Sequence, residues 1–151
     1  MTTDSYLHIV GPRPSFESIF MSLAFSLARR STCRRLKVGC VIARSDFRKI
    51  EAIGYNGGAA GQENDCESDE PGKCGHLHAE ENAIINGGVE RSTAKVFFTT
   101  NFPCPMCCKR IVNFGGVTHV YYGGEYRDGS GITILERAKI EVVHYPLEHA
   151  P

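Results

Sequence analysis

Residues 78–80, His78-Ala79-Glu80, and residues 103–107, Pro103-Cys104-Pro105-Met106-Cys107, are the two stretches that decide the fold and chemistry of this chain. They offer one imidazole and two thiolates, which fill three positions of a tetrahedral zinc ion and leave the fourth open for water. An open position distinguishes a catalytic zinc from a closed structural one. The two stretches therefore predict a catalytic zinc site held by His78, Cys104 and Cys107.

Glu80 is the candidate base for that site. Two thiolates cancel the formal charge of the metal, so this zinc should acidify its water less strongly than an all-histidine site would. Glu80 is the only carboxylate tied by sequence to a ligand, and it is not expected to bind zinc itself. Residues two apart in a regular helix diverge by about 200°. We therefore expect His78 at an irregular helix entry, with Glu80 as general acid and base.

Cys104 and Cys107 are three residues apart and so share one face of a helix. Pro105 suits the first helical position, which places Cys104 near the cap, where the positive helix end favours thiolate over thiol. A C-x-x-C pair alone also occurs in structural zinc knuckles and redox motifs. The combination of the two stretches is similar to the signature of zinc-dependent nucleobase deaminases.

Length and composition limit the function further. At 151 residues, 42% of them hydrophobic, the chain should form one domain over residues 1–151 with a substantial core. Lys plus Arg equals Asp plus Glu at 17 each, giving zero formal net charge. Proteins that bind a long polyanion usually carry an excess of basic residues. We therefore expect a small-molecule substrate and no stable binding to nucleic acid.

The chain also lacks the marks of export or membrane insertion. We find no run of about 18 apolar residues that would cross a membrane, and residues 1–4 do not begin a signal peptide. Seven cysteines in a chain of this kind indicate metal ligands and buried thiols rather than disulfides. The expected compartment is the reducing cytoplasm, with no membrane partner.

The hydrophobic periodicity predicts a three-layer α/β/α sandwich around a five-stranded mixed sheet. Helices between the third, fourth and fifth strands imply parallel crossovers, and the first two strands should form an antiparallel hairpin. The expected helices cover residues 16–30, 78–86, 104–114 and a short stretch ending at 138, and the expected strands cover residues 38–43, 50–55, 95–100, 117–122 and 140–145.

Across nearly its full length the chain resembles the deoxycytidylate (dCMP) deaminases of the cytidine deaminase-like superfamily. The zinc motifs are shared by the whole superfamily, whereas the Gly-Tyr-Asn-Gly stretch after the second strand and Arg-Ser before the first are more restricted. The matching pieces are residues 30–33, 38–39, 54–57 with Gly61, 78–80 and 102–107.

The resemblance implies roles for four substrate-binding residues. Arg30 and Ser31 would bind the substrate phosphate, Asn56 would hydrogen-bond the deoxyribose, and Tyr126 would pack near the base. Plainer readings remain open. The five cations of residues 29–37 also suit a solvated helix end, Asn56-Gly57 is an ordinary turn dipeptide, and Tyr126 suits a plug at the edge of the core.

The implied reaction is the hydrolytic deamination of dCMP to dUMP, which would supply dUMP for thymidylate synthesis, with dCTP as a possible further substrate. Water activated by Glu80 would attack C4 of cytosine, and Glu80 would pass protons to N3 and to the departing ammonia. Three alternatives stay open: a tRNA or polynucleotide base deaminase, a free-nucleoside deaminase, and a structural zinc module that binds a protein partner.

A second zinc site is expected from ligands outside the catalytic set. Some members of the resembled family use a comparable structural zinc, and a closed Cys3His set suits tetrahedral geometry. The alternative is a set of reduced thiols in a flexible acidic loop. Cys40 is better explained as a core thiol, and Cys108 points about 100° away from its neighbouring ligand. The candidate ligands are Cys33, Cys66, Cys74 and His76.

The resemblance also implies a homohexamer that dCTP activates and dTTP inhibits. Glycines let backbone N–H groups approach phosphates, and acidic side chains could hold ribose or a Mg²⁺ ion bridging the effector triphosphate. The alternative is a hairpin exit and loop with no effector. The candidate effector residues are Tyr55, Gly57, Gly61, Glu63 and Asp65.

Overall fold

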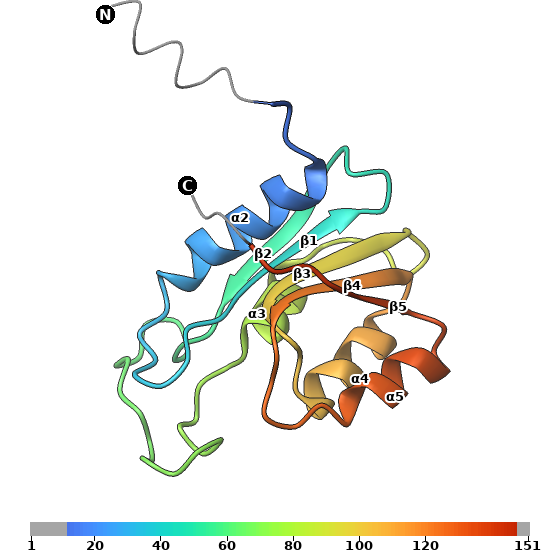
Figure 1. Ribbon diagram of the computed structural model, residues 1–151. Coiled ribbons are helices and arrows are strands. Elements are labelled where there is room, and N and C mark those ends of the chain that lie inside the picture. Colours follow the sequence, from blue (N-terminus) through green and yellow to red (C-terminus); the bar gives the residue numbers. More distant parts are fainter. Residues whose placement is uncertain (1–11, 148–151) are drawn as a thin grey trace, which may run out of the picture.

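Five strands in the order β2-β1-β3-β4-β5 form one mixed sheet in the computed structural model, which describes residues 12–147 (Figure 1). Residues 1–4, on which the expectation about a signal peptide rests, lie outside that range. The helices are α2 (Phe16–Ala28), α3 (Ala79–Asn86), α4 (Pro105–Phe114) and α5 (Gly131–Arg137). The strands are β1 (Gly39–Arg44), β2 (Ile50–Tyr55), β3 (Lys95–Asn101), β4 (Val117–Gly124) and β5 (Glu141–His144).

The strand directions confirm the expected topology. Strand β1 pairs antiparallel with both β2 and β3, whereas β3–β4 and β4–β5 are parallel pairs connected through α4 and α5. Element ends differ from the expected ones by one or two residues. Helix α2 ends at Ala28 rather than Arg30, because Arg29 caps it and donates its backbone N–H back to the last turn.

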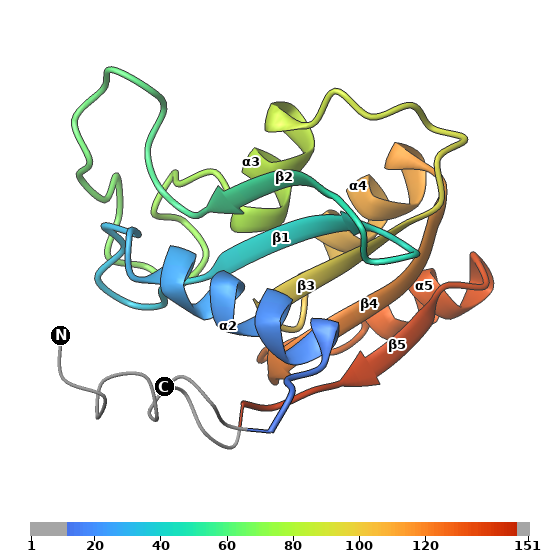
Figure 2. The ribbon, with the colours of Figure 1, turned by 90° about the horizontal axis from the view of Figure 1, so that it is seen from above.

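The helices form two layers, one on each face of the sheet, as the sequence predicts (Figure 2). Among the helices of residues 12–147, only α2 packs on one face, where Met21 and Ala24 belong to a cluster that includes Phe98 of β3. Helices α3, α4 and α5 cover the other face, where Ala83 and Ile111 belong to a second cluster. The expected α/β/α sandwich is confirmed.

Two glycines allow helices to lie very close to the hairpin strands. A Cβ atom on Gly39 of β1 would come 1.9 Å from the backbone oxygen of Ala24 in α2. A Cβ on Gly54 of β2 would come 2.3 Å from the backbone oxygen of Ala79 in α3. Side chains at these positions would collide with backbone, so the absence of a Cβ sets the distance between layers.

The predicted catalytic residues Cys104 and Cys107 follow the carboxyl end of the parallel strand β3. Strand β3 leads into the start of α4, and β4 leads into the loop before α5, so both connections lie at the same edge of the sheet. The backbone N–H of Phe102 donates to the carbonyl of Gly124 at 2.7 Å and holds these two exits together. None of the helices formed by residues 12–147 has the length and apolar character needed to cross a bilayer.

Candidate active site

His78 lies at the N-cap of α3, outside the regular helix. Its φ of −75° and ψ of 158° are extended, and its backbone N–H donates to Oε1 of Glu81 at 3.2 Å. This is the irregular entry that the sequence predicts. It lets the His78 side chain and Glu80, two residues on, face the same cavity.

Cys104 lies at the N-cap of α4 in the same manner. Its φ of −63° and ψ of 160° are extended, Pro105 follows as the first helical residue, and the backbone N–H of Cys107 donates to the Cys104 Sγ at 3.4 Å. The expected position of Cys104 is confirmed. Two helix N-termini, each with its positive dipole end, therefore meet at one point.

The three predicted ligand atoms of the catalytic site are close enough to hold one ion. Nδ1 of His78 is 3.4 Å from the Sγ atoms of both Cys104 and Cys107, and all three atoms lie within 4.8 Å of one another. Around a tetrahedral zinc, with bonds of about 2.3 Å to sulfur and about 2.0 Å to nitrogen, neighbouring N and S atoms are about 3.5 Å apart. The donor set and its spacing fit zinc.

The three ligand groups influence one another's protonation. The hydrogen bond between the two thiols lowers the pKa of Cys104, with further lowering from His78, and raises the pKa of Cys107. The hydrogen bond with Cys104 raises the pKa of His78. Because a metal binds thiolate and neutral imidazole, it would displace the protons shared among these groups.

Glu80 is a buried carboxyl group beside the ligand cluster. Only 4% of its surface is exposed, and burial raises its pKa above the usual value for a glutamate. Its Oε1 lies 3.1 Å from the hydroxyl oxygen of Thr99 in β3. A carboxyl group that gains protons readily and lies next to a water-binding metal position suits proton transfer.

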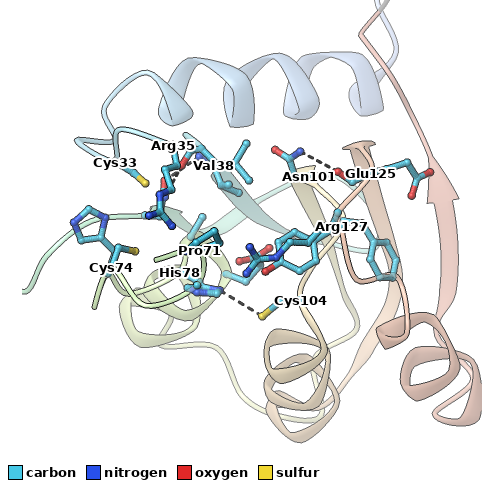
Figure 3. Close-up of a pocket in the computed structure, with 18 residues that line it drawn as sticks. Cys33, Arg35, Val38, Pro71, Cys74, His78, Asn101, Cys104, Glu125 and Arg127 are labelled. Carbon is cyan, nitrogen blue, oxygen red and sulfur yellow. Dashed lines mark hydrogen bonds between the residues drawn. The ribbon is translucent and has the colours of Figure 1, made fainter. Parts of the chain in front are cut away.

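These groups lie in a cavity of about 250 Å³ (Figure 3). His78, Glu80 and Cys104 line it together with Val38 of the segment before β1 and Phe102 after β3. Part of the long segment between β2 and α3 and part of the β4–α5 loop complete the wall. The residues from these two loops are Pro71, Gly72, Cys74, His76, Glu125, Tyr126 and Arg127.

Two of the four predicted substrate residues line this cavity. Tyr126 is one. Asn56 is the other, and its amide also connects two segments: Nδ2 donates to the carbonyl of Leu36 and Oδ1 accepts from the N–H of Val38, both at 2.8 Å. One Nδ2 hydrogen remains for a ligand.

Arg30 and Ser31 are not among the residues that line the cavity. The Arg30 guanidinium lies 5.7 Å from the centroid of the Tyr55 ring, and the Ser31 hydroxyl accepts from the N–H of Cys33 at 3.1 Å. Two other arginines, Arg35 and Arg127, line the cavity instead. Sequence reasoning missed both, although Arg35 belongs to the basic stretch 29–37 and Arg127 directly follows Tyr126.

Three of the four predicted ligands of the second zinc come together. The ligand atoms of Cys33, Cys74 and His76 lie within 4.8 Å of one another. His76 is buried, and neither of its ring nitrogens has a hydrogen-bond partner among residues 12–147. A bound metal would satisfy one of these nitrogens. The group therefore fits a metal. Cys66 is not part of it and lies beside the guanidinium of Arg34.

The five predicted effector residues lie along β2 and the segment that follows, and none lines the catalytic cavity. Tyr55 ends β2, and Gly57 forms an isolated bridge with Leu77. Gly61 has a φ of +77°, which favours glycine, and Glu63 and Asp65 are exposed. An effector site at these residues stays a prediction.

Comparison with known proteins extends these observations. Residues 14–124 match the model of the cytidine and deoxycytidylate deaminase zinc-binding region. The chain is 35% identical to the deoxycytidylate deaminase of Saccharomyces cerevisiae, with 92% of this chain and 47% of the yeast protein covered. It is 30% identical to the deoxycytidylate deaminase of Mycobacterium phage D29, with 75% of this chain and 98% of the phage protein covered. It thus spans about half the length of the yeast relative.

Solved structures agree with this assignment. The dCMP deaminase of cyanophage S-TIM5 in complex with dCMP and dUMP superposes with a TM-score of 0.75 at 34% identity, covering 87% of this chain and 98% of the phage chain. A tRNA:A34 deaminase, at 22% identity and a TM-score of 0.59, shares the fold. With its family match over residues 14–124 and its His-Cys-Cys cluster, this chain belongs to the cytidine and deoxycytidylate deaminase family.

Proposed function

We propose that this chain catalyses the zinc-dependent hydrolytic deamination of dCMP to dUMP and ammonia. The observation that carries the proposal is the buried Glu80 carboxyl group beside the His78, Cys104 and Cys107 cluster in a cavity. A structural zinc site needs only its ligands, so it gives no role to a buried carboxyl group that does not bind the metal. The yeast and phage relatives named as deoxycytidylate deaminases, and the phage structure with dCMP and dUMP, support this substrate.

His78, Cys104 and Cys107 would hold the zinc. When bound, zinc supplies a Lewis acid that lowers the pKa of water. Glu80 removes a proton from the attacking water and delivers it to N3 of cytosine, while the water oxygen bonds to C4. Glu80 then carries the second water proton to the amino group. The C4–N4 bond breaks, ammonia leaves, and the nucleotide remains as dUMP.

Two cavity residues would orient the substrate. Tyr126 offers an aromatic face to the base, and Asn56 offers its remaining Nδ2 hydrogen to the deoxyribose. Because Asn56 is fixed to the backbone at Leu36 and Val38, its amide is already oriented before substrate binds. We therefore expect it to position the sugar with little loss of side-chain freedom.

We also propose a second zinc site, a nucleotide effector site and a cytoplasmic location. Cys33, Cys74 and His76 would hold a second, structural zinc with one further ligand. The segment around Tyr55, Gly57, Gly61, Glu63 and Asp65 would bind dCTP or dTTP with Mg²⁺ in a homohexamer. The enzyme would work in the cytoplasm and supply dUMP for thymidylate synthesis. These statements are supported by family resemblance and, for the second zinc, by the partnerless nitrogens of His76.

Ammonia release from dCMP tests the proposal directly. Purified protein with measured zinc content would be assayed with dCMP, dCTP, deoxycytidine, a tRNA and a single-stranded DNA oligonucleotide. We expect turnover of dCMP well above that of the free nucleoside and both nucleic acids. Preferential deamination of the tRNA or the oligonucleotide would identify a polynucleotide deaminase, and no deamination at full zinc loading would favour a structural zinc module.

A further inference from the structure

One ion pair joins the two helices that carry the catalytic ligands. His78 caps the start of α3, and Cys104 caps the start of α4, which contains Cys107. Nη2 of Arg110 in α4 lies 2.9 Å from Oε2 of Glu81 in α3. Among the ion pairs formed within the described part of the chain, only this one connects the two helices. It therefore connects the two halves of the ligand set.

Glu81 contacts the first half of the site through His78. Its Oε1 accepts a hydrogen bond from the backbone N–H of His78 at 3.2 Å, while its other carboxylate oxygen, Oε2, faces Arg110. The carboxylate lies in the first turn of α3, where the positive end of the helix favours negative charge. Glu81 thus holds the backbone of one ligand residue and binds the neighbouring helix at the same time.

Arg110 contacts the second half of the site through Cys107. The two residues are three apart on α4, so their side chains share one face of the helix. Nη2 pairs with Glu81, and Nη1 donates to the Cys107 Sγ at 4.0 Å. Cys107 is fully buried, so water does not surround its sulfur. A positive charge beside this sulfur therefore stabilises a thiolate there more than it would on the open surface.

The pair is more sheltered from water than an ordinary surface ion pair. The side chains of Glu81 and Arg110 are 18% and 39% exposed, whereas those of Glu70 and Lys73 are 60% and 65% exposed. Highly exposed pairs contribute little, because water and salt screen them. Lys109, the cation next to Arg110, is exposed and forms no ion pair with any residue that the structure describes.

We propose that the Glu81–Arg110 ion pair holds α3 and α4 at the separation that the catalytic zinc requires and slows release of the metal. This inference rests on the proposed function, in which His78 and Cys107 are zinc ligands. Glu81 and Arg110 are positioning residues, since Glu81 acts through the His78 backbone and Arg110 through the Cys107 sulfur. Residues that contact metal ligands typically account for about 10- to 100-fold in metal affinity or activity.

Transfer of zinc to a coloured chelator tests the inference without an activity assay. Cys107→Ser, which lacks one catalytic ligand, identifies the phase of release that belongs to the catalytic site. Arg110→Met keeps much of the apolar stem and removes the charge, and it should speed this phase by about 10- to 100-fold. Glu81→Gln should speed it less, because the amide oxygen can still accept from the His78 N–H. The double variant should release zinc no faster than Arg110→Met, because the two side chains act as a unit.

Cobalt substitution gives a readout that a purely structural role would not move. Thiolate-bound Co²⁺ absorbs in the near ultraviolet as charge passes from sulfur to the metal. A positive charge beside the sulfur lowers the energy of its electrons, so Arg110→Met should shift this band to longer wavelength. Arg110→Lys keeps the charge and loses the planar fork. It should restore the band position and much of the slow zinc release.

Lys109→Ala is the matched control, and it should match the wild type in both measurements. Equal acceleration of zinc release by Lys109→Ala would overturn the inference. Wild-type zinc release with an unmoved cobalt band in Arg110→Met would overturn it too, as would a double variant in which the effects of Glu81→Gln and Arg110→Met multiply. Neither measurement depends on turnover. A wild type that binds zinc but does not deaminate dCMP would therefore contradict the proposed function alone.

Discussion

The Thr99 hydroxyl oxygen lies 3.1 Å from Oε1 of Glu80 and 3.0 Å from the carbonyl oxygen of Asn101. A hydroxyl has one hydrogen, so it cannot donate to both oxygens at the same time. When Glu80 is ionised, Thr99 can donate to it. When Glu80 is protonated, its O–H can donate to Thr99, which then donates to Asn101. Thr99 can therefore accommodate both protonation states of the proposed acid and base.

Thr99→Val keeps the shape of the side chain and removes this hydrogen bond. We expect kcat for dCMP to fall by about tenfold, since a typical hydrogen bond contributes about 1 kcal/mol and a charged partner somewhat more. KM should change little, because Thr99 does not line the cavity. Steady-state kinetics would measure both. Thr133→Val is the control, and an unchanged kcat in Thr99→Val would contradict this positioning role.

The Cys33, Cys74 and His76 group predicts a second zinc whose ligands do not include Cys66. Metal analysis of wild type should give two zinc ions per chain, and Cys74→Ser should give one. The unfolding temperature of Cys74→Ser should fall as well, because structural zinc binding contributes to folding free energy. Cys66→Ser should retain two ions. A single zinc in fully active wild type, or loss of zinc in Cys66→Ser, would contradict this arrangement.

The close approach of α2 to β1 predicts a strong effect of a single methyl group. Gly39→Ala would place its Cβ 1.9 Å from the Ala24 backbone oxygen, so the helix or the strand must move. We expect a loss of about 3 kcal/mol or more in the free energy of unfolding. Gly88→Ala is the matched control, since a Cβ there meets nothing within 4 Å. Equal stability of the two variants in urea titrations would show that the layers can separate at little cost.

The sequence predicts best where one residue fixes local geometry. Pro105 marks the start of α4 and so places Cys104 at the cap, and the spacing from His78 to Glu80 requires an irregular helix entry; the structure has both. The sequence predicts the positions of residues in irregular segments less well. Which arginine of the stretch 29–37 faces the cavity depends on how an irregular segment turns, and no periodicity encodes that turn.

Cys66 shows the same difficulty for ligand sets. Spacing along the segment between β2 and α3 made Cys66 and Cys74 equal candidates, but the folded segment brings Cys74 to Cys33 and leaves Cys66 beside Arg34. The difference arises from tertiary contacts. The hydrogen bonds of the Asn56 amide with the backbone of Leu36 and Val38 likewise join segments far apart in sequence. The turn dipeptide Asn56-Gly57 does not predict them.

The most direct test of the account is the pair of measurements on Glu80→Gln: zinc content and the rate of ammonia release from dCMP. Glutamine has nearly the same shape as glutamate, and residue 80 is not one of the proposed zinc ligands. The variant should therefore keep the zinc content of the wild type. General acid–base catalysis contributes about 10²- to 10⁴-fold, so turnover should fall by at least about 100-fold. A Glu80→Gln enzyme with full zinc content and wild-type turnover would contradict the assignment of Glu80 as the proton carrier.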